Sequence, residues 1–460
     1  MAPGARHAVW LTGESVTPQN PQEEGFVMSR FIRRSAIALP ALLIAPITAA
    51  AVALPAQAAS TWSAALPLPF SVGSQGFAEN ASGAQVAAST TGIQGESSVV
   101  VASSANGLTW SAPLTIDTGE NPAVAIAPSG RAVVAWEGGP ATAPVIQASV
   151  MPPGGTWSAP VNVSTDAFGG PVIGMDGSGN AIVAWTGGGK EIRTASLPAG
   201  GSWTAVDTLD PAVDGFALGL AVNSAGSAIV TWVEPARTIM AASGTILGGF
   251  GAPVTLAADV IRKSPVSGPA SQVTLDAYEN PALGGIPQVN SAYLHGHTDV
   301  VLSKSGEASL ASAVTTTVHN VTTRSAGGTW NTPMGLPLPG PSSAEPDYET
   351  AIDGAGDVTT VYQQGSSVDL IRLPAGSSTW TTPVVLAASS SMGMVAGDTA
   401  GTFVAAMDTS SGLSVLTSPP GGSFGAATTL PTTALATALV IDPGHAVLIA
   451  GGSVFTEPVS

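Results

Sequence analysis

The chain has 460 residues, of which 44% are apolar and 9% charged, and its formal net charge is −17. This apolar content excludes a chain that is disordered throughout, and the negative charge disfavours nucleic acid and anionic lipid as partners. With 55 Gly, 37 Pro and no Cys, the chain has no disulfide or thiol chemistry. The same composition favours short strands and turns over long helices.

Residues 28–58 have the pattern of a secretory signal peptide. Three arginines come first, an apolar run over 36–54 follows, and Ala56-Gln57-Ala58 forms a small-residue cleavage site. An uncleaved membrane anchor is the alternative, because the run is nearly long enough to span a bilayer. Its two prolines and the cleavage site favour removal. We therefore expect a secreted, extracellular protein without stable membrane insertion, and we interpret residues 1–27 as a misassigned start or a disordered extension before Met28.

An aromatic residue recurs after a short turn of small residues through the rest of the chain. Successive copies are 44 to 50 residues apart, apart from one separation of 80. A period near 47 in a sequence rich in strand formers is typical of a propeller blade. The copies are Trp62, Trp110, Trp157, Trp203, Phe250, Trp330, Trp380 and Phe424.

A second motif keeps step with the first. Asp, Asn or Ser usually stands at its first position, Gly stands at its fourth, and a run of strand formers follows. This spacing is typical of a tight hairpin turn whose Gly has a positive φ. The turn glycines are Gly83, Gly130, Gly179, Gly226, Gly306, Gly356 and Gly401, and residues 441–450 open one more copy.

Together the two motifs predict an all-β fold, a β-propeller formed by residues 59–460. Each unit consists of four antiparallel strands. A lone aromatic strand remains at 60–70 and a lone hairpin at 433–458, and pairing them would remove two exposed sheet edges. We expect eight blades, with one shared between the two ends of this domain; seven blades is the alternative.

The aromatic turns resemble the Asp-box, or BNR, repeat of sialidase-like propellers, in a degenerate form. In "SSANGLTW" the residues Ser103, Gly107, Thr109 and Trp110 match that repeat, while Ala105 occupies its Asp position. Gly and Trp persist in three further copies, at Gly154/Trp157, Gly200/Trp203 and Gly327/Trp330. The resemblance implies a propeller. We interpret the repeated Trp as a packing wedge rather than a sugar-stacking residue.

One connection departs from the repeat. Phe250 and Gly306 are 56 residues apart, where other copies show 20 to 26. We place an insertion at about 257–300, on the face that carries the links between blades. Long loops in compact domains are often functional. Candidate ligand-binding aromatics are Trp136, Trp185, Trp232 and Tyr362 near that face and Tyr293 in the insertion; packing between blades is the alternative for the first four.

Within the insertion, His295, His297 and Asp299 are spaced so that one side of a strand would carry all three. This pattern raises the hypothesis of a divalent metal site, and no other cofactor is expected. Residues 176–180 offer several oxygen ligands, but they fall short of a calcium loop, so we interpret them as a structural turn.

Sialidases use an arginine cluster, yet Arg193, Arg324 and Arg372 match no catalytic motif of that family. We therefore expect a monomeric binding module that recognises an extracellular glycan, a cell-wall component or a protein through the insertion-bearing face. A degenerate sialidase-like glycoside hydrolase and a structural repeat protein without ligand are the alternatives. We favour binding over catalysis.

Overall fold

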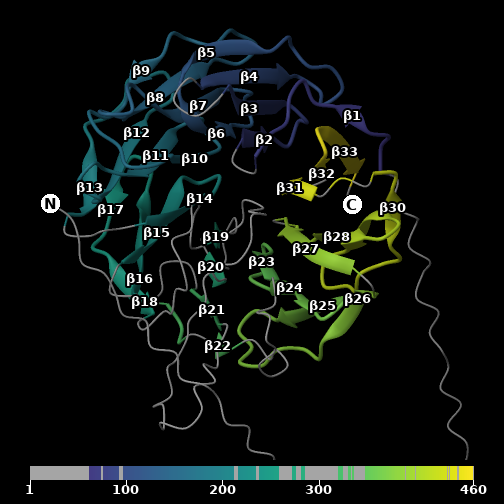
Figure 1. Ribbon diagram of the computed structural model, residues 1–460. Coiled ribbons are helices and arrows are strands. Elements are labelled where there is room, and N and C mark those ends of the chain that lie inside the picture. Colours follow the sequence, from purple (N-terminus) through teal and green to yellow (C-terminus); the bar gives the residue numbers. More distant parts are fainter. Residues whose placement is uncertain are drawn as a thin grey trace, which may run out of the picture. The chain divides into compact units, whose positions relative to one another are not determined.

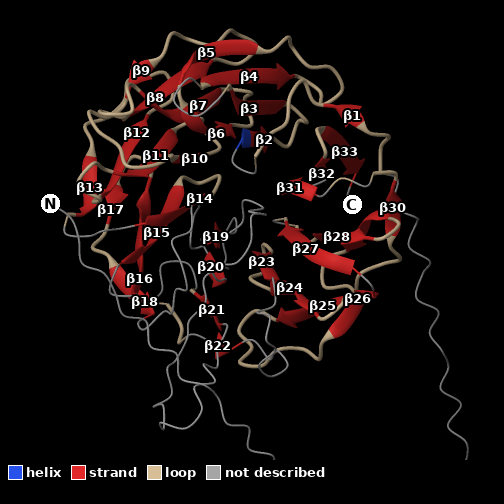
Figure 2. Cartoon of the chain, in the orientation of Figure 1, coloured by secondary structure: helices blue, strands red, loops and turns tan. Residues whose placement is uncertain are grey.

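The computed structural model describes residues 62–458, except 74–75, 93–96, 212–215, 235–237, 258–271, 276–280, 285–319, 325–329, 333, 336–347, 389, 399, 433, 435 and 443–444. Strands account for nearly all regular structure in this part of the chain (Figure 2). The described strands form antiparallel sheets, most of them four-stranded, and we number these sheets in chain order.

The first four sheets follow one another along the chain (Figure 1). The first contains β2 (Phe77–Glu79), β3 (Gln85–Thr91), β4 (Ser98–Ser104) and β5 (Leu114–Thr118). The second contains β6 (Glu120–Ile126), β7 (Ala132–Gly138), β8 (Val145–Met151) and β9 (Val161–Asn162). The third contains β10 (Val172–Met175), β11 (Ala181–Thr186), β12 (Ile192–Leu197) and β13 (Asp207–Asp210). The fourth contains β14 (Phe216–Val222), β15 (Ser227–Glu234), β16 (Thr238–Thr245), β17 (Gly249–Phe250) and β18 (Val254–Ala257).

The remaining sheets repeat this order, and the eighth also takes in the first strand of the chain. The fifth contains β19 (Gln272–Leu275), β20 (Pro281–Gly284), β21 (Asn320–Thr323) and β22 (Met334–Gly335). The sixth contains β23 (Tyr348–Ile352), β24 (Val358–Gln364), β25 (Ser367–Leu373) and β26 (Val384–Ala388). The seventh contains β27 (Ser390–Gly397), β28 (Phe403–Thr409), β29 (Gly412–Ser418) and β30 (Thr428–Leu430). The eighth contains β31 (Ala436–Asp442), β32 (His445–Ala450), β33 (Ser453–Pro458) and β1 (Leu66–Pro67).

Each sheet contacts the next one in chain order, mainly through its first strand, and β31 of the eighth sheet contacts β2 of the first. The contacts between sheets therefore follow a cyclic order, as in a β-propeller. Strand β1 pairs with β33, with Leu66 opposite Val454 and Pro67 opposite Ser453. The predicted pairing of the first aromatic strand with the last hairpin is present.

The turn between the first two strands of a sheet has the same geometry in six described copies. The carbonyl of the first residue accepts the N–H of the fourth residue, a Gly, at 2.8 to 3.2 Å. The φ of these glycines is 78° to 98°, a region that favours Gly over other residues. In five copies the Oδ1 of Asn80, Asp176, Asn223, Asp353 or Asp398 also accepts two backbone N–H groups of its own turn, at 2.7 to 3.1 Å.

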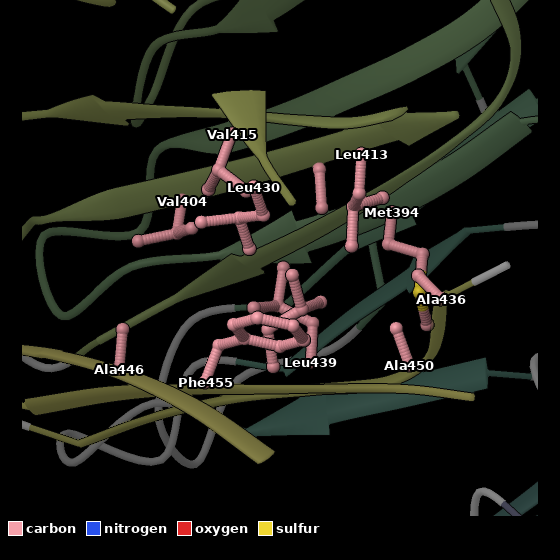
Figure 3. Packing of buried hydrophobic residues seen from close by; sticks show 12 residues of the cluster. Met394, Val404, Leu413, Val415, Leu430, Ala436, Leu439, Ala446, Ala450 and Phe455 are labelled. Atoms are coloured by element: carbon pink, nitrogen blue, oxygen red, sulfur yellow. The ribbon is translucent and has the colours of Figure 1, made fainter. Parts of the chain in front are cut away.

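The core lies between neighbouring sheets. Figure 3 shows the cluster between the seventh and eighth sheets, which includes Val404, Val415 and Phe455. Burying each side chain of this size contributes roughly 1.5–3 kcal/mol. Seven of the repeated aromatics are half-buried against the cluster that their own sheet forms with the sheet before it. They are Trp62, Trp110, Trp157, Trp203, Phe250, Trp380 and Phe424. Their expected role as packing wedges is confirmed.

The fifth sheet differs from the expectation. Strands β19 and β20 fall inside the range predicted as an insertion, 257–300, and pair with each other as the first hairpin of this sheet. Residues 276–280, which connect β19 to β20 in the sequence, lie outside the described residues, as does Gly306, where the sequence motif had placed the first turn of this unit. The extra residues are 285–319, between β20 and β21, and they lie outside the described residues. Counting residues from one Gly to the next aromatic could not reveal this, because strand pairing over such separations is decided by packing.

No helix in the described ranges is long and apolar enough to cross a membrane.

Candidate ligand-binding face

Antiparallel topology sorts the connections of every sheet onto two edges. The turns between first and second strands and between third and fourth strands share one edge, which we call the turn face. The loops between second and third strands and the links between sheets share the other edge, the loop face. In the fifth sheet, the described end of β20 and the described start of β21 belong to the loop face.

On the turn face, the polar groups of the turns form hydrogen bonds with one another. Asp176 illustrates this: its Oδ1 accepts the N–H of Ser178 and Asn180 at 2.9 and 2.8 Å, and its Oδ2 accepts the amide of Asn180 at 2.7 Å. Turns of neighbouring sheets also bond to each other, since the N–H of Gly177 donates to the carbonyl of Ser224 at 2.9 Å. Both carboxylate oxygens of Asp176 are engaged, which supports the structural interpretation of residues 176–180 over calcium binding.

Four of the predicted ligand-binding aromatics lie in the core. Trp136, Trp185 and Trp232 are 0% exposed and Tyr362 is 1% exposed, each within a cluster of buried residues. The indole N–H of Trp136 donates to Oε1 of Gln147 at 3.1 Å. A ligand from solution would not reach these side chains, and packing between sheets, the alternative weighed for them, accounts for their position.

The other predicted site residues, Tyr293, His295, His297 and Asp299, lie outside the described residues. Within the ranges that the structure describes, no group of three His, Asp or Glu side chains is placed to hold a metal ion. The divalent metal site at 295–299 therefore stays a prediction.

The three arginines considered for a sialidase-like site are each held by separate partners. Arg372 donates to the carbonyl of Gly422 at 2.5 Å and lies over the rings of Phe403 and Phe424. Arg324 donates to Oγ of Ser243 at 2.9 Å and lies over the ring of Trp330. Burial lowers the pKa of Arg372, and the carboxylates of Asp357 and Asp353 raise it. Arg324 and Arg372 thus tie neighbouring sheets together.

Arg193, the third of these arginines, belongs to a cluster on the loop face of the third sheet. Its two terminal nitrogens form ion pairs with Asp166 and Glu191. The side chains of Arg193, Asp166 and Glu191 are 22%, 39% and 12% exposed, so the cluster is open to solvent on one side. Beside it lies Phe168, whose side chain is 56% exposed. The other large hydrophobic residues that are exposed in the described ranges are Leu and Val.

The loop over 187–190 is shaped around this ion cluster. A Cβ on Gly187 would lie 2.7 Å from Oε1 of Glu191, and a Cβ on Gly188 would lie 3.3 Å from Oδ2 of Asp166. The backbone of this loop therefore passes close to the charged groups, and a larger residue at 187 would displace the side chain of Glu191. The loop ends on Lys190, whose φ is 68° and whose ammonium lies 5.2 Å from the centroid of the Phe168 ring.

Asn121 brings the second sheet into the same surface. Its φ is 54°, and Asn121 and Lys190 are the two non-glycine residues with positive φ in the described ranges. A Cβ on Gly170 would lie 2.5 Å from the Cβ of Asn121, so the link that carries Phe168 runs directly against Asn121. Backbone strain of this kind concentrates at functional sites. We call Asn121, Asp166, Phe168, Lys190, Glu191 and Arg193 the Phe168 cluster.

Several carboxyl groups on the loop face bind protons more tightly than usual. Burial raises the pKa of Glu137, the hydrogen bond from Asn121 lowers it, and Glu120 raises it. Burial also raises the pKa of Glu234, and the neighbouring Asp210 raises it further. Burial raises the pKa of Asp408 to about 6, against a lowering by the N–H of Ala436. Of these three carboxyl groups, Asp408 is the one whose pKa is raised as far as about 6.

Sequence reasoning missed the Phe168 cluster. The segments "DAFGGP" over 166–171 and "TGGGKE" over 186–191 do carry a signal, because each combines glycines with charged or aromatic residues away from the two repeated motifs. Their proximity depends on the packing of β9, β10 and β11, which the separate segments do not reveal.

The fold places the chain among repeat proteins of the β-propeller type, built from many four-stranded antiparallel sheets. No protein-family model matches the chain, and no curated protein matches it either. The Asp-box subtype suggested by the sequence thus has no support from a family match.

Solved structures give distant likenesses. BamB from Moraxella catarrhalis is 12% identical with a TM-score of 0.48, and the match covers 87% of this chain and 100% of that one. The BP39L lectin from Burkholderia pseudomallei is 12% identical with a TM-score of 0.46 and coverages of 78% and 100%. YCF48 bound to a D1 peptide is 13% identical with a TM-score of 0.46 and coverages of 90% and 100%. These values carry nothing about ligands.

Proposed function

We propose that this protein is a secreted binding module built as a propeller of eight blades, and that it recognises an extracellular glycan, a cell-wall component or a protein through its loop face. Each sheet is one blade, and the eighth is shared between β1 and the hairpin β32–β33. The closing contacts are specific. The N–H of Leu68 donates to the carbonyl of Gly452 and the N–H of Ser63 to that of Thr456, both at 2.8 Å.

The difference between the two faces carries the binding proposal. On the turn face, the polar groups of the short turns form hydrogen bonds within the turns themselves, and the same pattern recurs from sheet to sheet. On the loop face, connections of the second and third sheets bring together an exposed aromatic ring, ionised side chains and two strained residues. Binding sites typically combine a rigid scaffold with variable loops on one side. Secretion rests on the signal-peptide pattern over 28–58.

Blocking one face at a time tests this proposal. Because the chain has no Cys, single-cysteine variants can be coupled to a bulky polyethylene glycol maleimide. Thr142→Cys lies on an exposed part of the loop face, and Ser178→Cys is its exposed counterpart on the turn face. The mature chain is first screened on a glycan array, on isolated cell walls and by pull-down from extracellular medium.

We expect the coupled Thr142→Cys variant to lose binding and the coupled Ser178→Cys variant to retain it. Loss only with the turn-face label would overturn the assignment of the face. A blank result in all three screens, with a correctly folded chain, would overturn the binding function itself. N-terminal sequencing of protein collected outside the cell tests the export step; a start near residue 59 is expected.

A further inference from the structure

The Phe168 cluster presents an open ring next to groups that donate and accept hydrogen bonds. Asp166 and Glu191 supply carboxylate oxygens, and Arg193 supplies nitrogens between them. These charges are paired within the cluster, so it offers hydrogen bonding without a strong net charge. The exposed ring of Phe168 supplies a flat apolar surface.

This combination selects the chemistry of the ligand. A phosphate or carboxylate would require cations that are not already paired with acids, and the overall charge of −17 would repel it. A purely apolar ligand would displace water from the charged groups of the cluster and would form no hydrogen bonds with them in its place. A sugar ring has an apolar C–H face and a rim of hydroxyl groups, which matches an aromatic plane bordered by polar side chains.

We propose that the Phe168 cluster is a subsite for an uncharged saccharide, with one sugar ring stacked on the face of the Phe168 ring opposite the Lys190 ammonium and its hydroxyls bonded to Asp166, Glu191 and Arg193. The inference rests on the proposed function and names its ligand class. Lys190 is a positioning residue: its backbone, held at φ 68°, keeps the ammonium above the ring and limits the orientation of Phe168.

The shape of the loops supports a built site. The glycines at 187 and 188 allow the backbone to approach Glu191 and Asp166, and Gly170 allows the link to approach Asn121. The link that carries Phe168 and the loop that ends on Lys190 therefore meet beside one aromatic ring. Gly170 is required for this arrangement, because a Cβ there would overlap the Cβ of Asn121.

Titration of neutral polysaccharides tests the inference. A soluble β-1,4-glucan and a galactomannan are titrated into the mature chain by calorimetry, with a polyuronate of similar length for comparison. Phe168→Ala should weaken binding about tenfold, which corresponds to about 1.4 kcal/mol of lost ring stacking. Phe168→Trp should retain it, and Phe168→Leu, which is apolar but not flat, should lose it.

The matched control is Leu108→Ala, since Leu108 is 61% exposed on the turn face. It should leave binding unchanged, and all four variants should melt as the parent does, because both residues are exposed. Binding of a neutral polysaccharide that Phe168→Ala does not alter would overturn the subsite and leave the proposed function standing. Preference for the polyuronate, or a Phe168-dependent protein partner with no polysaccharide binding, would overturn the saccharide assignment. If the chain bound no partner at all, both the saccharide subsite and the proposed binding function would be overturned.

Discussion

Asp408 lies at the loop-face end of β28, where the seventh sheet meets the eighth. Burial raises its pKa to about 6, although the N–H of Ala436 donates to its carboxylate. A carboxyl group whose pKa is raised in the folded state binds its proton more tightly there than in the unfolded chain. The free energy of unfolding therefore falls as the pH rises from about 4 to above 6.

Asp408→Asn should remove this penalty while keeping an oxygen that accepts from Ala436. We expect the variant to be more stable than the parent at pH 8, by on the order of 1 kcal/mol after discounting for solvent screening. The two should be equally stable at pH 3.5, where both carry a neutral side chain. Urea unfolding at the two pH values measures the difference in free energy of unfolding between the variant and the parent. The same difference at both pH values would contradict the prediction.

The buried aromatics show what residue-level reasoning can miss. Trp136 stands six residues after a turn Gly, near the loop face, and its position suggested a pocket. The structure buries its ring against the second and first sheets, with Gly119 so close that a Cβ there would lie 2.4 Å from the indole. Sequence spacing located the residue along its strand but not the side to which the ring packs.

At the scale of elements, the Gly-containing turn is the device that joins the first two strands of a sheet. Its fourth residue has a positive φ in every described copy, and at Gly130 an added Cβ would meet nothing within 4 Å. Replacement there changes backbone conformational energy alone, which makes Gly130 a clean test of the turn.

Gly130→Ala should destabilise the protein by about 1 kcal/mol, because a Cβ disfavours φ of 82°. Gly73→Ala is the control, since Gly73 also has open space around it and no positive φ. Chemical denaturation of both variants gives the comparison. Equal stability of the two would mean that the turn relaxes to another conformation.

The fifth sheet marks the limit of motif counting at this scale. The Gly motif predicts the first hairpin of this unit at Gly306 and treats residues 257–300 as an insertion. Strands β19 and β20 pair instead, with Gln272 opposite Gly284 and Leu275 opposite Pro281. Pairing depends on which strands contact β14 of the fourth sheet and β23 of the sixth, and local turn chemistry does not encode those contacts.

At the scale of the whole molecule, a short ladder joins the first strand of the domain to the last. Strand β1 has two residues, and Trp62 packs on the cluster between the seventh and eighth sheets. Across the neighbouring junction, between the first and eighth sheets, Nδ1 of His445 lies within hydrogen-bond distance of Oε1 of Glu79. The two ends of the domain therefore hold the cyclic order of contacts together.

A disulfide across this ladder should stabilise the fold. In a chain without Cys, Leu66→Cys with Val454→Cys places two thiols at paired positions. Oxidation should raise the free energy of unfolding by roughly 2–4 kcal/mol, because the bond closes a loop of nearly the whole domain. The melting temperature of the oxidised double variant, compared with its reduced form and each single variant, measures this. Failure to form the bond would argue against the pairing of β1 with β33.

The sequence by itself determined the repeat, the order of strands and turns in most units, and the aromatic packing residues. These features depend on local turn geometry and on the regular spacing of the two motifs. The sequence also placed the first strand with the last hairpin, since two incomplete units at the ends of one domain complement each other. Only the tertiary structure decided the strands of the fifth sheet, the burial of Trp136, Trp185, Trp232 and Tyr362, and the assembly of the Phe168 cluster. Each of these arises from packing between segments distant in the chain, and packing is a property of the folded whole.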